Sequence, residues 1–373
     1  MNKPKSLIYR YAFTAIFLLG IVAQQAFARQ TEYTKYVDPF VGNADNGHTF
    51  PGACRPFGMI QTSPVTGGIG WRYCSEYVYS DSIIWGFTQD HLNGTGCMDL
   101  GDILVMPSTG KRTHSWDGYR SHFYKTQEFA TPGYYSVYLT DTKVKAELTA
   151  SAHVAFHRYT YDSTDSTSVL IDLQHGPAWN DKQYHSQVNR CETHWEDAYT
   201  LVGHVQNTVW VKQDYFFIIK FNRPVASHIT LSKAADTEKG DRIVATFDGI
   251  EQGEQLLMKI AMSTTSVDGA KKNLYTEVPY WDFAAVKQSA NNEWNKYLKR
   301  IDIEGTDDQK KNFYTSFYHA LIQPNQIADV DGMYRNAADK IVKAENGLFY
   351  STFSCWDTYR AAHPFYTIVM PDR

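Results

Sequence analysis

The sequence changes its hydrophobic period near residue 265, and this change limits the folds that the chain can adopt. From about residue 34 to residue 265, short runs rich in strand-forming residues are separated by clusters of Gly, Asp, Asn and Pro, which is the pattern of β-strands joined by turns. Residues 133–140 and 144–161 are the clearest runs, and Val154, Phe156 and Tyr159 are candidates for inward-facing positions. Many short strands at this spacing predict an N-terminal antiparallel β-sandwich, so we expect a mainly β fold.

After residue 265 the pattern becomes helical. Apolar residues recur at steps of three and four, which gives one helix face, and this face consists of Phe283, Val286, Ala290, Trp294 and Leu298. A second helix is predicted for residues 306–322. Asp307 and Asp308 would lie in its first turn, where negative charge is favourable, and Pro324 would end it. Strands followed by helices indicate separate layers or domains rather than a parallel βαβ sheet.

The first 28 residues have the features of a secretory signal peptide. A basic segment ends at Arg10, residues 12–23 are apolar, and Ala26-Phe27-Ala28 fits a small-x-small cleavage site. The apolar run is too short to span a bilayer as a helix. We therefore expect the chain to be secreted across the inner membrane, to lose residues 1–28, and to act in the periplasm or outside the cell without an integral membrane segment.

Charge and cysteine usage narrow the classes of ligand. Removal of three of the 36 basic residues with the signal peptide would leave 33 against 40 acidic residues, so nucleic acid is not an expected partner. The five cysteines, at positions 54, 74, 97, 191 and 355, include no Cys-x-x-Cys pair, so no structural zinc site is predicted. An oxidising compartment allows disulfides, but an odd number leaves at least one thiol free, and the sequence assigns no pairs.

Aromatic residues make up 15% of the sequence. Taken alone, this content favours a large β-rich core, because aromatic residues favour strands. The alternative is a surface that binds glycans. One segment near the C-terminal end of the sequence supports that alternative, because Trp356, Asp357 and Arg360 combine an aromatic ring, a carboxylate and a guanidinium. Such a group can stack on the C–H face of a sugar and form charge-assisted hydrogen bonds to its hydroxyls.

Three further segments are expected to form loops or turns. Residues 38–64 and 70–102 are so rich in Gly and Pro that we expect shaped loops with several tight turns, and loops on a rigid β scaffold often carry functional groups. Residues 325–352 are expected to form a loop or a small hairpin. A third helix is then expected to open within residues 353–364.

The two loops and the C-terminal segment resemble motifs of glycoside hydrolase family 92. The matching motifs follow the family's order and are Gly47-His48, Pro51-Gly52-Ala53, Pro56-Phe57-Gly58-Met59, Ser63-Pro64, Gly70-Trp71, Cys74-Ser75, Gly86-Phe87, His91-Leu92-Asn93-Gly94-Thr95-Gly96, Gly101-Asp102 and Trp356-Asp357-Thr358-Tyr359-Arg360. The resemblance implies an exo-acting, inverting, calcium-dependent α-mannosidase that acts on mannose-containing glycans, including N-glycans. It also implies a β-sandwich, linker helices and an (α/α)6 barrel. It covers nearly all of the mature chain but only the N-terminal half of the family.

Pattern and resemblance together give the expected domain boundaries. Residues 1–28 would be the signal peptide and residues 29–268 the β-sandwich domain. Residues 269–323 would form the linker helices. Residues 324–373 would be the incomplete start of the helical catalytic domain.

The resemblance also assigns substrate-binding residues. Trp71 would reach into the mannose pocket, Asp357 would bind sugar hydroxyls, and Arg360 would support them. Each has a structural alternative: Trp71 as a buried core residue, Asp357 as a helix N-cap, and Arg360 as the ion-pair partner of Asp357. Trp356 completes the set, with packing as its main expected role.

Other positions carry weaker signals. Arg72-Tyr73 and Glu76 depart from the common family pattern of Asp-Gly and Gly, which leaves the linkage preference open. His48 and His91 are expected to be structural loop histidines. An acidic group formed by Asp90, Asp99 and Asp102 could bind a cation or form turns.

The resemblance implies that the reacting groups lie beyond the position of Arg360. Inversion needs a general acid and a general base, roughly 6.5–9.5 Å apart, and calcium needs oxygen ligands. In the family these groups belong to the helical domain, so no catalytic residue and no metal ligand is expected in residues 1–373. The chain alone is therefore expected to be inactive. Two alternatives stay open: a non-catalytic carbohydrate-binding β-sandwich, and a mutarotase-type epimerase, which would need its own His and Glu pair.

Overall fold

A computed structural model describes residues 32–110, 116–163, 165–176, 188–209, 212–233, 236–351 and 355–373. The predicted signal peptide lies outside the described residues. The chain divides into two units, Met1–Tyr33 and Thr34–Arg373, and the fold below is that of the second unit. No helix in the described part of the chain combines the length and the apolar character needed to cross a membrane.

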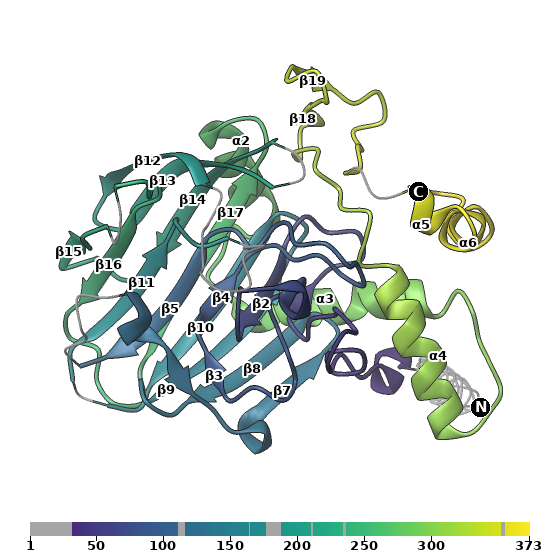
Figure 1. Cartoon of the computed structure of the whole chain (residues 1–373), viewed down its shortest axis with the longest axis horizontal. Helices are drawn as coiled ribbons and strands as arrows, with labels where there is room; N and C mark the ends of the chain where they lie inside the picture. The colour runs from purple at the N-terminus through teal and green to yellow at the C-terminus, as the bar shows by residue number, and fades with distance from the viewer. Residues whose placement is uncertain are drawn as a thin grey trace, which may run out of the picture. The chain divides into compact units, whose positions relative to one another are not determined.

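Two antiparallel sheets form most of the second unit (Figure 1). The first sheet has seven strands, in the spatial order β1 (Ala53–Cys54), β2 (Gln61–Val65), β4 (Gly86–Thr88), β5 (Leu104–Thr109), β11 (Thr167–Asp172), β16 (Arg242–Phe247) and β15 (Ser227–Thr230). The second has eight strands, in the order β12 (Val188–Asp197), β13 (Thr200–Thr208), β14 (Lys212–Phe221), β17 (Gln255–Ser263), β10 (Val154–Tyr161), β9 (Val144–Ala150), β8 (Tyr134–Leu139) and β7 (Glu128–Thr131). The predicted antiparallel sandwich is confirmed.

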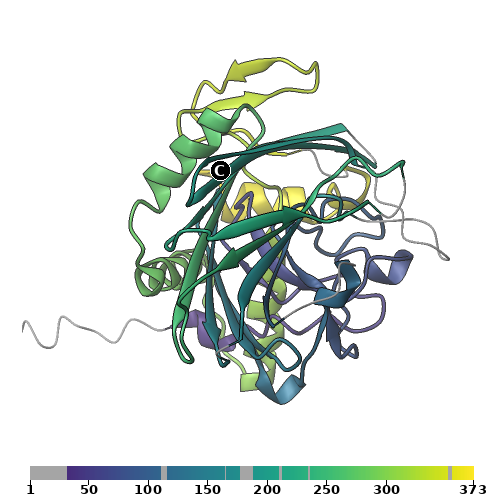
Figure 2. The ribbon, with the colours of Figure 1, turned by 90° about the vertical axis from the view of Figure 1, so that its left-hand side faces the viewer.

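The two sheets face each other (Figure 2), and the main hydrophobic core takes buried side chains from both. Each sheet turns one face of its strands inward, because side chains alternate across a strand. Buried members from both sheets include Val105, Ile171, Ile243, Leu148, Tyr159 and Phe217. Removal of this apolar surface from water is the main driving force for the sandwich.

Strand β10 contributes to two cores. Tyr159 and Tyr161 belong to the core between the sheets, whereas Val154 and Phe156 belong to a second core on the outer face of the eight-stranded sheet. All of these positions are buried, as the sequence predicts. Val154 and Phe156, however, face the helices rather than the other sheet, so the prediction that they point into the sandwich is wrong and only Tyr159 of the three does so.

Helices α2 (Val267–Glu277) and α3 (Phe283–Leu298) cover that outer face. Leu274 of α2 and Phe283 of α3 pack into the second core. Helix α4 (Asp307–Ala320) begins after Thr306, whose side chain forms a reciprocal capping box with Gln309, an arrangement that satisfies two free donors of the first turn. Both predicted helices are confirmed.

Two hydrogen-bonded contacts hold α3 against β1. The buried indole Nε1–H of Trp294 donates to the carbonyl of Cys54 at 2.8 Å. Next along the chain from Cys54, the Arg55 guanidinium lies 2.7 Å from the Glu293 carboxylate. The first helical layer is therefore joined to the sandwich through specific polar bonds as well as apolar packing.

The remaining elements are short. Strands β18 (Met333–Arg335) and β19 (Ile341–Lys343) form the small hairpin that was one expectation for residues 325–352, and β3 (Ile83–Ile84) pairs with β6 (Ser121–His122). Helices α5 (Cys355–Thr358) and α6 (Ala362–Val369) follow. Four 3₁₀ helices complete the description: η1 (Tyr33–Tyr36), η2 (Trp71–Tyr73), η3 (Trp116–Tyr119) and η4 (Lys125–Gln127).

Candidate functional site

Trp71 opens the 3₁₀ helix η2, in the connection between β2 and β3. Gly70, which precedes it, has a φ of 82°, a conformation that glycine adopts without steric cost. The Trp71 side chain is 47% exposed, so Trp71 is not the buried core residue of the alternative interpretation. A half-exposed aromatic ring of this kind can stack on the apolar face of a sugar.

Two neighbouring segments hold the Trp71 ring. The indole Nε1–H donates to the carbonyl of Gly96 at 2.8 Å. The His48 imidazole meets the indole at an interplanar angle of 89°, with ring centroids 4.4 Å apart. A Cβ atom at position 96 would lie 3.1 Å from Nε1, so glycine at this position allows the close approach of the loop.

His48 is itself a buried residue, which agrees with its expected structural role. Burial lowers the pKa of His48, so the ring is neutral at physiological pH. Its backbone has a φ of 52°, and its carbonyl accepts a hydrogen bond from the N–H of Gly94 at 2.6 Å. The segment of His48 and the segment of Gly94 are thus directly bonded.

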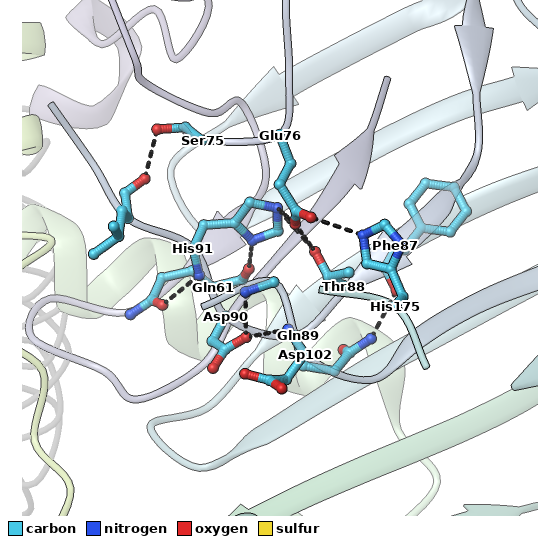
Figure 3. Close-up of polar contacts among 12 residues, drawn as sticks. Gln61, Ser75, Glu76, Phe87, Thr88, Gln89, Asp90, His91, Asp102 and His175 are labelled. Atoms are coloured by element: carbon cyan, nitrogen blue, oxygen red, sulfur yellow. Dashed lines mark hydrogen bonds and ion pairs between the residues drawn. The ribbon is translucent and has the colours of Figure 1, made fainter. Parts of the chain in front are cut away.

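Glu76 lies at the centre of a buried polar cluster (Figure 3). Its Oε1 lies 2.7 Å from Nε2 of His175, and its Oε2 accepts a hydrogen bond from the Thr88 hydroxyl at 2.8 Å. Burial alone would raise the pKa of Glu76, but attraction to His175 and the hydrogen bonds lower it below the ordinary value. The carboxylate is therefore ionised and fully engaged inside the protein.

His91 faces the same carboxylate, with Nε2 at 3.4 Å from Oε2 of Glu76. Burial lowers the pKa of His91, so the ring is neutral. Its Nδ1 lies 2.8 Å from the Gln61 carbonyl and must carry the proton, because a carbonyl only accepts. Nε2 is then an acceptor, and the Thr88 hydroxyl, 3.0 Å away, can donate to His91 or to Glu76. These contacts agree with a structural role for His91.

Asp90 and Asp102 form a second buried acidic group beside the cluster (Figure 3). Oδ1 of Asp90 accepts hydrogen bonds from the backbone N–H groups of Gly101 at 3.0 Å and Asp102 at 2.7 Å. Asn207 of β13 donates to Oδ1 of Asp102 at 2.5 Å. Burial raises the pKa of Asp90 to about 7 and raises that of Asp102 well above its usual range. Since two adjacent buried carboxyl groups resist joint ionisation, the pair holds a proton at neutral pH.

This acidic group supports the turn interpretation rather than a cation site. Throughout the described ranges, no group of three or more His, Cys, Asp or Glu side chains is placed to hold a metal ion. The Oδ2 atoms of Asp90 and Asp102 are buried and have no hydrogen-bond partner among the described residues, but two oxygens fall short of the six to eight that calcium takes. Among the described residues, the pair of Asp90 and Asp102 therefore does not fit a calcium site.

The other predicted substrate-binding residues lie on and after helix α5. Trp356 is 77% exposed, which does not fit its expected packing role. Asp357 is exposed and lies in the first turn of α5 rather than at an N-cap position. Arg360 donates from Nε to the Tyr359 hydroxyl at 3.0 Å. No ion pair joins Arg360 to Asp357 in the described part of the chain.

One electrostatic contact relates Asp357 to the loop that holds Trp71. Burial raises the pKa of the Cys97 thiol, and the negative charges of Asp99 and Asp357 raise it further. Cys97 directly follows Gly96, the hydrogen-bond partner of the Trp71 indole. The charge of Asp357 therefore acts on the segment that fixes Trp71, whereas Arg360 is bonded only to its own neighbour among the contacts described.

Sequence reasoning did not find the pair of Glu76 and His175. The sequence marks Glu76 as a departure from the family pattern and gives no signal for His175. The two residues are 99 positions apart, so no local spacing connects them. A glutamate in a Gly-rich loop, at a position where relatives commonly carry Gly, is the one signal that the sequence offers.

Comparisons with known proteins place both halves of this chain in one family. Residues 36–263 match the glycosyl hydrolase family 92 N-terminal domain, and residues 269–373 match the glycosyl hydrolase family 92 catalytic domain. Among solved structures, the family GH92 α-mannosidase BT3965 from Bacteroides thetaiotaomicron is similar, with 31% identity and a TM-score of 0.82 over 90% of this chain and 47% of that one. That enzyme is also known in complex with mannoimidazole.

Two further relatives are similar over a comparable share of this chain. The inverting mannosidase BT2199 from the same organism is 26% identical, with a TM-score of 0.76, over 90% of this chain and 46% of that one. A protein of Arthroderma benhamiae described as an uncharacterized secreted glycosidase is 22% identical over an alignment of 397 positions, which covers 93% of this chain and 48% of that protein. The chain spans about half the length of these relatives.

Proposed function

Because the chain belongs to glycosyl hydrolase family 92, we propose that it supplies the N-terminal part of an exo-acting α-mannosidase. Such an enzyme removes terminal α-linked mannose from glycans, N-glycans among them, with inversion at the anomeric carbon. One observation carries the proposal: the ring of Trp71 is half exposed and held by Gly96 and His48. The effect of the Asp357 charge on the pKa of Cys97, which follows Gly96, supports it.

In this proposal the two residues form one wall of a sugar pocket. Trp71 offers a flat apolar ring to the C–H face of the terminal mannose. Asp357 accepts hydrogen bonds from sugar hydroxyls, which are stronger when the acceptor is ionised. Trp356 and Arg360 flank Asp357, and their exposure supports a role in contact with the sugar.

In this proposal, residues outside this wall cleave the glycosidic bond. An inverting mechanism places an acid and a base on opposite sides of the scissile bond, with room for a water molecule. We place these two groups, and the oxygen ligands of calcium, outside residues 1–373. When bound, calcium would supply a hard cation for the sugar hydroxyls.

Domain organisation and location complete the proposal. A signal peptide at residues 1–28 would direct secretion, and the β-sandwich domain at residues 29–268 would carry Trp71. Linker helices at residues 269–323 would lead to the first part of the catalytic domain at residues 324–373, which carries Asp357. The description of the Arthroderma benhamiae relative as secreted supports the location.

Binding of a simple mannoside to the purified mature chain tests the proposed wall. We expect methyl α-mannoside to bind with a millimolar Kd in saturation-transfer NMR, since only one side of the pocket is present. Trp71→Ala and Asp357→Asn should each weaken binding at least 10-fold, because each removes a contact of about 1.5 kcal/mol or more. Tyr280→Ala, which changes another exposed aromatic residue, should bind as the parent chain does.

The same preparation separates the alternatives. Release of mannose from an α-linked mannobiose should be undetectable, and measurable release would show that residues 1–373 contain a working catalytic pair. Micromolar binding without hydrolysis would instead favour the non-catalytic carbohydrate-binding protein. Equal affinity in the parent chain, Trp71→Ala and Asp357→Asn would overturn the assignment of this wall.

A further inference from the structure

The orientation of Trp71 depends on residues outside its own turn. Two contacts of its ring with described residues come from Gly96 and from His48. A half-exposed indole that lost these contacts could rotate about its side-chain bonds, because solvent offers no fixed partner. The spacing of the His48 and Gly96 segments therefore decides where the ring points.

Ser75 touches both segments. Its hydroxyl oxygen lies 2.5 Å from the carbonyl of His48 and 2.7 Å from the carbonyl of Leu92. A hydroxyl has one proton, so the two carbonyls share it. Ser75 is 1% exposed, and water is therefore poorly placed to replace the hydroxyl.

Ser75 is also firmly joined to the turn of Trp71. Cys74, which lies between them, caps η2 through its backbone N–H to the Trp71 carbonyl, and its thiol lies 2.9 Å from the same oxygen. On the other side, the N–H of Glu76 bonds to the Tyr73 carbonyl at 2.9 Å. The hydroxyl of Ser75 is therefore fixed relative to Trp71 and can set the distance to both neighbouring segments.

We infer that Ser75 is a positioning residue for the proposed mannose site: its buried hydroxyl draws the His48 and Leu92 segments together and so fixes the Trp71 indole in the orientation that receives the sugar. This inference rests on the proposed function for its meaning in sugar binding. The effect on the indole itself does not depend on any ligand.

The test follows the Trp71 indole N–H in the mature chain by ¹⁵N NMR, with Trp71→Phe to assign the resonance. In Ser75→Ala we expect that resonance to shift or broaden and its exchange with solvent to become at least 10-fold faster. The Kd for methyl α-mannoside should rise about 10-fold. Ser80→Ala is the matched control, because Ser80 lies on the same connection, is exposed and contacts only the Arg72 side chain among the bonds described.

A second variant tests the same inference if Ser75→Ala folds poorly. Gly96→Ala leaves Ser75 intact but places a Cβ 3.1 Å from the indole Nε1, so it should reproduce the shifted indole resonance and the weaker binding. If Ser75→Ala lowers Tm while the Trp71 resonance and the mannoside Kd stay at parent values, Ser75 is only structural and the inference is wrong. If Trp71→Ala leaves binding unchanged, the proposed function fails, while the indole resonance still reports on Ser75.

Discussion

Among single residues, Glu76 shows how a buried carboxylate anchors the connection that carries the half-exposed Trp71. Its backbone has a φ of 58°, which costs a non-glycine residue of the order of 1 kcal/mol. Its carbonyl accepts the N–H of Thr66 at 2.8 Å, and its carboxylate bonds to His175 and Thr88. These bonds offset the strain and tie the connection that carries Trp71 to the first sheet.

Substitution of Glu76 should therefore destabilise the fold. We expect Glu76→Gln to lower the free energy of unfolding at pH 7 by about 3 kcal/mol, because it removes a buried carboxylate from its bonds to His175 and Thr88. Urea unfolding checks this value. Glu192→Gln, which removes a carboxylate from an exposed pair with Arg190, should cost less than about 1 kcal/mol.

The difference in stability between the parent chain and Glu76→Gln should depend on pH. The folded pKa of Glu76 lies below its ordinary value of 4.5, so its contribution is present above pH 4.5 and is lost as the pH falls through the folded pKa. The stability difference between the parent chain and Glu76→Gln should shrink below pH 4.5. A difference that stays constant down to pH 3 would contradict an ionised Glu76.

A second residue-scale prediction concerns His157, which is buried in β10. Burial lowers its pKa from 6.5 to about 3, so the folded state favours the neutral ring. Stability is fully present above pH 6.5 and should fall by about 1.4 kcal/mol per pH unit as the pH drops toward 3. Because His157→Gln removes this titration, its urea midpoint should change less between pH 6.5 and pH 4.5 than that of the parent chain; equal slopes would argue against it.

Sequence patterns predicted the roles of single residues unevenly. Trp71 could be placed in a loop by its glycine-rich surroundings, and its exposure agrees with that placement. The partners of Glu76 could not be predicted, because His175 reaches it only through the strand order of the sheet. Polar networks that join distant strands leave no periodic trace in the sequence.

At the scale of elements, the hydrophobic period predicted whether a segment is a strand or a helix, but it did not predict which faces of a strand are covered. The change of period near residue 265 correctly separated strands from helices, since β17 ends at Ser263 and α2 begins at Val267. The period of 144–161 did not show that β10 is covered on both faces. A strand buried on two sides becomes apolar at most positions, which hides the alternation that identifies one inward face.

The junction between α2 and the β9–β10 turn should depend on pH. Glu277, the last residue of α2, lies 2.6 Å from Nδ1 of His153, and its carboxylate also accepts from the Ser151 hydroxyl at 2.6 Å. Burial opposes both charges, but mutual attraction raises the pKa of His153 above 6.5 and lowers that of Glu277 below 4.5. The pair therefore contributes most between pH 4.5 and pH 6.5 and weakens as the pH rises through the His153 pKa.

We expect Glu277→Gln to cost about 2 kcal/mol at pH 5.5 and clearly less at pH 9. Chemical unfolding at the two pH values measures the difference. Glu254→Gln serves as the control, because Glu254 pairs with Arg223 at the surface and its removal should cost less than about 1 kcal/mol. A larger loss at pH 9 than at pH 5.5 would show that His153 is not charged in the folded protein.

For the molecule as a whole, the sandwich and the first helices are expected to behave as one folding unit. Trp294 of α3 is fully buried, donates to the Cys54 carbonyl of β1, and packs against Tyr318 of α4 with ring centroids 4.3 Å apart. One side chain thus joins the sheet to two helices. Family membership was accessible from motif order alone, but this junction depends on contacts across 240 positions and could not be read from spacing.

Trp294→Phe tests this coupling. It removes the only indole donor to the Cys54 carbonyl among the described contacts and leaves a smaller ring in a closed core, so we expect a loss of about 2–3 kcal/mol. Far-UV circular dichroism and tryptophan fluorescence should still report one coincident transition at a lower midpoint. Trp356→Phe changes an exposed ring and should leave the midpoint unchanged. Two separate transitions in the parent chain would show that the helices fold independently of the sandwich, and the predicted cooperativity would then be wrong.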